Sequence, residues 1–176
     1  MRAHSVKIDT LIFETTEEAF AALQAGRCDA YTDDTGSLAA ARSTMKTPSD
    51  WDIMDDVINP SPLGLHVRQG DENWVIITRW LHFAFLIAEQ KGLTQANVDD
   101  MATKATDPFV RRLLGVDGDY GKPVGLDKDW VRRVIKTAGN YAEIYDRWFG
   151  PKALDLPRGM NKQWDKGGLH MSWAWQ

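Results

Sequence analysis

The sequence predicts an α/β fold, in which short apolar strands alternate with amphipathic helices. Near its start, a strand, a helix and a second strand follow one another within about twenty-five residues, and later segments carry apolar residues at helical spacing. Of the 176 residues, 43% are hydrophobic and 26% are charged, an ordinary composition for a globular protein. We therefore expect one domain or two small lobes.

The first strand is expected over residues 10–14 and the second over residues 28–32. Between them, Thr15 and Glu18 have the spacing of a capping box, which predicts a helix over residues 17–25 that Gly26 ends. A strand–helix–strand unit of this length predicts a right-handed crossover between parallel strands.

Two carboxylates, Asp33 and Asp34, follow the second strand directly. In open α/β sheets ligands bind outside the carboxyl ends of the strands, so an acid at this position can pair with a ligand cation. The next helix, expected over residues 37–45, would also favour a negative charge at its N-terminus. The alternative is that Asp33 or Asp34 only caps this helix, and the residues alone leave both interpretations open.

A seam between a small α/β part and a largely helical part is expected near residues 59–62, where two prolines interrupt the pattern. Residues 51–58, before the seam, alternate loosely and predict one bent strand or two short ones. Residues 63–68, after it, have an apolar side chain at every second position and predict another strand.

The helical part is dominated by a predicted helix over residues 72–91, capped by Asp71 and mostly buried. His82 within it is interpreted as a core or boundary residue, because no second ligand lies three or four positions away. The other helices are expected over residues 94–102, 109–114, 127–149 (the longest) and 161–164.

Charge and cysteine content exclude several classes of protein. The net charge of −4 provides no basic face for phosphate contacts, so nucleic acid is not an expected partner. Cys28 is the only cysteine, which excludes an internal disulfide and a metal site of the CxxC type. The longest apolar run, residues 74–88, is too short to cross a bilayer, and no signal peptide is recognised at the N-terminus. We expect no membrane span, no metal and no cofactor.

Several segments resemble the substrate-binding proteins of polar amino-acid ABC transporters, most closely the general L-amino-acid-binding subfamily. The main ones are residues 26–34 (Gly-Arg-Cys-Asp-Ala-Tyr-Thr-x-Asp) and 62–74 (Pro-Leu-Gly-x-x-Val-Arg-Gln-Gly-Asp-x-x-Trp). Further matching segments are residues 111–115, 125–130, 139–141 and 164–169. The resemblance covers nearly all of the chain, but only the C-terminal half of such a protein.

The resemblance implies an incomplete fold of the type II periplasmic-binding-protein class. Residues 1–60 would be a remnant of the ligand-binding lobe two, residues 61–68 the crossover strand between lobes, and residues 69–176 the C-terminal part of lobe one. It also implies that Asp34 pairs with the α-amino group of an L-amino acid, and that Asp33 approaches the ligand side chain. Cys28 would have lost a disulfide partner on an absent strand.

The function implied by the resemblance is that of a periplasmic solute-binding component, which delivers amino acids to the permease subunits of a transporter and is not an enzyme. Two alternatives are an enzyme on the same fold, such as a dehydratase, and a truncated chain that binds nothing alone. Because the strands of such a chain lack the sequence neighbours that the family supplies, self-association through exposed strand edges is also expected.

Overall fold

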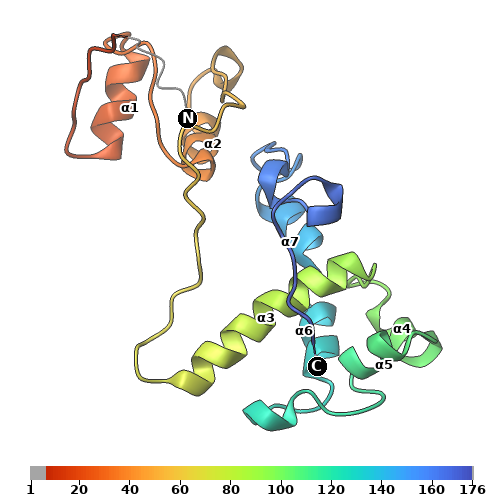
Figure 1. Ribbon diagram of the computed structural model, residues 1–176. Coiled ribbons are helices and arrows are strands. Elements are labelled where there is room, and N and C mark those ends of the chain that lie inside the picture. Colours follow the sequence, from red (N-terminus) through yellow and green to blue (C-terminus); the bar gives the residue numbers. More distant parts are fainter. Residues whose placement is uncertain (1–6, 176) are drawn as a thin grey trace. The chain divides into compact units, whose positions relative to one another are not determined.

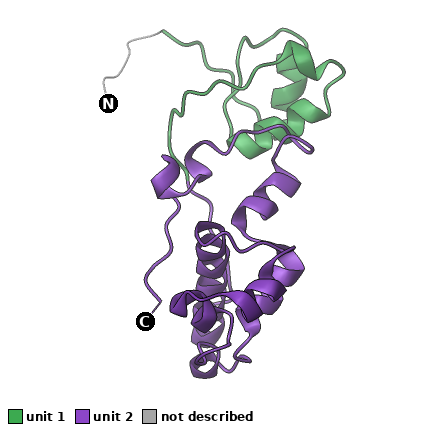
Figure 2. Ribbon diagram, turned by 90° about the vertical axis from the view of Figure 1, so that its right-hand side faces the viewer, with its two compact units in different colours: residues 1–61 green, residues 62–176 purple. Residues whose placement is uncertain are grey.

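A computed structural model describes residues 7–175 of the protein (Figure 1). The chain divides into two compact units, residues 1–61 and residues 62–176 (Figure 2). That division falls close to the seam expected at residues 59–62, while the assignment of the units to lobes stays a prediction.

The described residues of the first unit, 7–61, form two α-helices, α1 (Thr16–Gln24) and α2 (Thr35–Ser43), and a short 3₁₀ helix, η1 (Pro48–Asp50). Helix α1 begins as expected, because the Thr15 hydroxyl accepts a hydrogen bond from the backbone N–H of Glu18. Gly26 follows the helix with φ of 68°, a conformation that glycine adopts without strain. The buried apolar side chains of this unit are few and mostly small: Ala19, Ala22, Leu23, Ala39 and Met45.

The strands expected over residues 10–14, 28–32, 51–58 and 63–68 are not formed. The only β-pairing in the described chain is an isolated bridge between Gln163 and His170. Residues 7–14, 28–33 and 52–70 make no backbone–backbone hydrogen bond within the part of the chain that the structure describes. The physical reason is that a strand is stable only beside another strand, and these segments have no such neighbour there. Their exposed apolar side chains are Ile8, Leu11, Ile12, Met54, Val57, Ile58, Leu63 and Leu65.

The second unit is built from helices. In order they are α3 (Glu72–Gln90), α4 (Val98–Lys104), α5 (Pro108–Leu113), η2 (Lys122–Val124), α6 (Trp130–Ala138), α7 (Tyr141–Trp148), η3 (Gly159–Asn161) and η4 (Trp164–Lys166). One apolar core joins the C-terminal half of α3 to α4, α5 and α6. Its fully buried members include Leu93, Val98, Leu113, Leu114, Val131 and Ile135.

Helix α3 begins where the sequence predicts, since the Asp71 carboxylate accepts a hydrogen bond from the backbone N–H of Trp74 at 2.9 Å. The expectation that this helix is mostly buried is correct only for its C-terminal half, where Ala84 and Ala88 have no exposed surface. Near its start, Trp74 is 52% exposed and Ile76 is 39% exposed.

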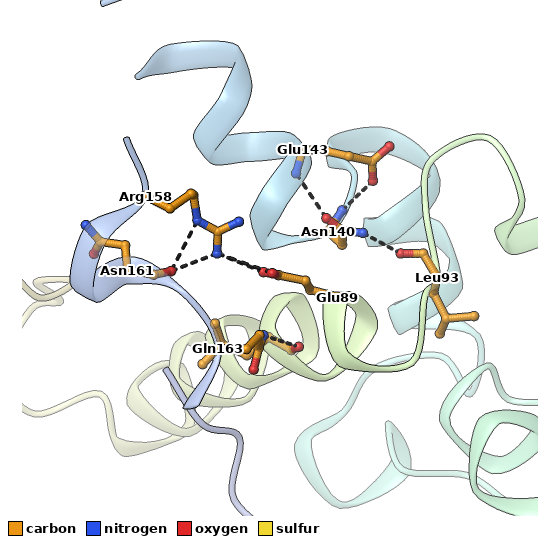
Figure 3. A network of polar contacts seen from close by, with 8 residues as sticks. Glu89, Leu93, Asn140, Glu143, Arg158, Asn161 and Gln163 are labelled. Atoms are coloured by element: carbon orange, nitrogen blue, oxygen red, sulfur yellow. Dashed lines mark hydrogen bonds and ion pairs between the residues drawn. The ribbon is translucent and has the colours of Figure 1, made fainter. Parts of the chain in front are cut away.

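The prediction of a single helix over residues 127–149 is wrong, because the chain forms two helices there, separated at Gly139 and Asn140. Gly139 has φ of 83°, and Asn140 forms a complete capping box with Glu143 at the start of α7. The Asn140 side chain also donates a hydrogen bond to the Leu93 carbonyl oxygen at 2.7 Å (Figure 3). One buried side chain thus starts α7 and fixes it to the loop that follows α3.

Replacing Asn140 should destabilise the second unit. Asn140→Ala removes a helix cap, worth about 1 kcal/mol, and leaves the buried Leu93 carbonyl without its partner, at about 1–3 kcal/mol. We expect the free energy of unfolding, measured by urea denaturation, to fall by roughly 2–3 kcal/mol. Arg79→Ala, at an exposed position on α3, is the control and should change it by less than about 0.5 kcal/mol. Equal effects of the two substitutions would contradict the assigned role.

Candidate functional site

Asp33 and Asp34 lie between the extended segment 28–33 and the start of α2, and both side chains are exposed. Asp34 occupies the N-cap position of α2, but its side chain makes no capping hydrogen bond. Its carboxylate accepts no hydrogen bond and forms no ion pair within the described chain, although it lies at the positive end of the helix dipole. The structure therefore leaves this carboxylate free to meet a cation.

Asp33, in contrast, has both carboxylate oxygens engaged. One accepts a hydrogen bond from the backbone N–H of Asp34 at 2.7 Å, and the other accepts one from the hydroxyl of Tyr31 at 2.9 Å. The two neighbouring acids therefore differ in what they can do, because Asp33 is tied to its own chain and Asp34 is not.

Tyr31 is the member of this group that the sequence interpretation missed. Its ring lies 4.7 Å from that of Phe20 on α1, so it connects that helix to the segment carrying the two acids. Burial raises the pKa of Tyr31, and the hydrogen bond and charge of Asp33 raise it further. The signal was available, since residues two apart in an extended segment point to the same side.

The second unit contains an apolar cavity of about 210 Å³, lined by side chains from α3, the loop around η2, α6 and the end of the chain. Trp80, Tyr120, Trp130 and Trp175 contribute most of its aromatic wall. None of its lining side chains is charged, so it offers no ion-pair partner to an ammonium or a carboxylate group.

Within residues 7–175, no group of three or more His, Cys, Asp or Glu side chains is placed to hold a metal ion. None of the helices over the same residues is long and apolar enough to cross a membrane. His82 is half-buried at the edge of the core, in agreement with its interpretation as a boundary residue.

Comparison with solved structures defines the class of protein. The chain superposes on an ABC transporter periplasmic binding protein from Brucella ovis, solved with glutathione bound, with a TM-score of 0.82 and 48% sequence identity. The match covers 91% of this chain and 50% of that one. The fold is therefore that of a periplasmic binding protein, present in part.

Curated proteins of similar sequence are named as amino-acid-binding proteins. The chain is 44% identical over 146 residues to the glutamate/glutamine/aspartate/asparagine-binding protein BztA of Rhodobacter capsulatus, covering 82% of this chain and 43% of BztA. It is 41% identical over 171 residues to the general L-amino acid-binding periplasmic protein AapJ of Rhizobium johnstonii, covering 96% of this chain and 50% of AapJ. No protein-family model matches the chain.

The chain thus belongs to the family of amino-acid ABC transporter substrate-binding proteins, which confirms the resemblance. It spans about half the length of the curated relatives it matches, consistent with a C-terminal half.

The contact between Tyr31 and Asp33 can be measured directly. Because the negative charge of Asp33 contributes to the raised pKa of Tyr31, Asp33→Asn should lower this pKa toward the ordinary tyrosine value of about 10. The pKa can be followed by NMR of ring-labelled tyrosine. Asp34→Asn is the matched control and should leave the pKa of Tyr31 unchanged. The assigned hydrogen bond is refuted if Asp33→Asn has no more effect than Asp34→Asn.

Proposed function

We propose that this chain forms part of a solute-binding protein that captures an L-amino acid for uptake by an ABC transporter, with Asp34 as the acid that pairs with the ligand's α-amino group. The observation that supports this role is the free carboxylate of Asp34 at the start of α2, beside an acid that is fully engaged. An ammonium group that leaves water on binding must meet a carboxylate, or its desolvation would prevent tight binding.

Asp33 has a different place in this proposal from the one the resemblance implies. Its two hydrogen bonds hold the backbone of Asp34 and the ring of Tyr31, so it positions the binding acid instead of contacting the ligand itself.

The proposed setting is the periplasm, with the permease subunits of the transporter as the partners that receive the ligand. The names of two relatives support this setting. AapJ is named a general L-amino acid-binding periplasmic protein, and BztA is named for binding glutamate, glutamine, aspartate and asparagine. No observation on this chain favours the alternative of a dehydratase.

The binding role can be tested on this chain mixed with, or joined to, the half of AapJ that it does not match. Asp34→Asn keeps a side chain that caps helices equally well but removes the negative charge. Losing one partner of a desolvated charge pair costs about 2–5 kcal/mol, so calorimetry should show amino-acid affinity falling by roughly 30-fold or more. Asp29→Asn, at an exposed position earlier in the same segment, is the control and should retain affinity. If Asp34→Asn binds as tightly as the parent, Asp34 is only the N-cap residue of α2. If the parent assembly does not bind amino acids, the proposed function fails.

The extended segments of this chain also predict that it self-associates. The extended segments 7–14 and 52–70 expose apolar side chains and unpaired backbone groups, which together form a template for strand pairing between molecules. We expect light scattering of the purified chain to show dimers or larger species whose fraction rises with concentration. Leu65→Lys, which places a charge in the alternating segment, should reduce them, whereas a monodisperse monomer at all concentrations would contradict this expectation.

A further inference from the structure

A segment near the end of the second unit, residues 157–170 (the tail), is held against α3 by buried polar contacts. The Gln163 side chain, only 1% exposed, donates a hydrogen bond to the Leu86 carbonyl oxygen at 2.9 Å. The Arg158 guanidinium forms an ion pair with Glu89 at 3.0 Å, and their side chains are only 16% and 8% exposed (Figure 3). Docking of the tail therefore depends on polar groups that have largely left water.

One positive charge, on Arg158, and one negative charge, on Glu89, meet at this contact. The Arg158 guanidinium lies over the rings of Tyr141 and Tyr145 of α7, at 5.2 and 5.3 Å, and also donates to the Asn161 carbonyl oxygen. Glu89 is the one carboxylate that pairs with it in the described chain. A further positive charge at this place would have no negative partner of its own.

Two histidines stand at this contact, one on each side. His170 belongs to the tail, and its ring lies 4.5 Å from Tyr141 and 6.1 Å from the ring of His82 on α3. Both are half-buried. A proton on the His170 ring would place a second positive charge near Arg158, and a proton on the His82 ring would place one near His170, in a region of reduced solvent access.

We propose that His82, His170 and Arg158 form an acid-sensitive clasp, in which two neutral imidazoles allow the tail to dock on α3 and protonation of either ring releases it. The groups that face the pair are Arg158 of the tail, Glu89 of α3, and Tyr141 of α7 beside Tyr145. Only Glu89 opposes release, and it is already paired with Arg158.

The direction of the pH dependence follows from the environment of each ring. Burial lowers the pKa of His82. Burial also lowers the pKa of His170, the charges of His82 and Arg158 lower it further, and Glu89 acts in the opposite direction. In a released tail both rings would regain the ordinary pKa of about 6.5. The docked state therefore binds fewer protons, so docking is strongest above that pH and weakens as the pH falls below it.

The experiment is hydrogen exchange of the purified chain, measured by mass spectrometry between pH 7.5 and pH 5.0 and corrected for intrinsic exchange rates. This window lies above the range in which ordinary carboxylic acids titrate. Peptides from residues 159–170 should lose protection as the pH falls, by up to about tenfold per pH unit for each proton taken up on release. Peptides from α4 and α6 should keep theirs.

Matched variants identify the groups responsible. His82→Gln with His170→Gln should make protection of the tail independent of pH in this window, whereas His66→Gln, at an exposed position, should behave as the parent does. A parent tail equally protected at both pH values overturns the proposal, and so does a double variant that keeps the parent's pH dependence. If the double variant does not fold, histidine NMR of the parent decides: resonances of His82 and His170 that titrate at or above about 6.5 would refute the clasp. The clasp lies within the second unit, so its outcome is independent of amino-acid binding.

Discussion

Polar groups buried around the C-terminal end of α3 determine how the second unit is assembled. The Leu93 carbonyl is bonded by Asn140, and the Glu89 carboxylate by Arg158, so two segments distant in sequence are drawn to the same end of one helix (Figure 3). Apolar packing alone would tolerate several arrangements of α6, α7 and the tail. Buried polar groups tolerate few, because each must find its partner with good geometry. The apolar core supplies the stability of this unit, whereas the Asn140–Leu93 hydrogen bond and the Arg158–Glu89 ion pair favour one arrangement of its helices and tail.

The first unit is held together differently. It buries few side chains, most of them alanine, and relies on contacts between residues close in sequence. The Tyr31 ring rests on Phe20, and Arg27 lies 5.9 Å from the centre of the Phe13 ring. The backbone N–H of Asp34 is hydrogen-bonded to Asp33, which also accepts a hydrogen bond from Tyr31. The position of the Asp34 carboxylate therefore depends on these two hydrogen bonds.

The helices could be predicted from the sequence because their signals are local. The hydroxyl of Thr15 and the carboxylate of Asp71 both accept bonds from a backbone N–H three residues later, as their positions before the helices suggest. The strands could not be predicted reliably, because alternation describes one face of a strand but not whether a neighbour exists. The break before α7 had a local signal in Asn140 and Glu143, but the apolar stripe from Trp130 to Trp148 suggested a continuous helix.

The candidate site is still a prediction, and only its place in the chain could be proposed from the sequence. An acid pair after an expected strand pointed to Asp33 and Asp34, although that strand is not formed, and the resemblance assigned Asp34 to the α-amino group. Their different roles depend on which atoms each carboxylate contacts, and composition and spacing do not carry that information.

The extended segment 52–70 gives the chain a point of vulnerability during its lifetime in the cell. Proteases bind their substrates as extended backbone whose N–H and C=O groups are free to pair with the enzyme, and this segment already has that form. Cleavage there needs no prior unfolding of the helices on either side. Turnover of the protein would then be set by how long this segment stays uncovered, and much less by the stability of the helical core.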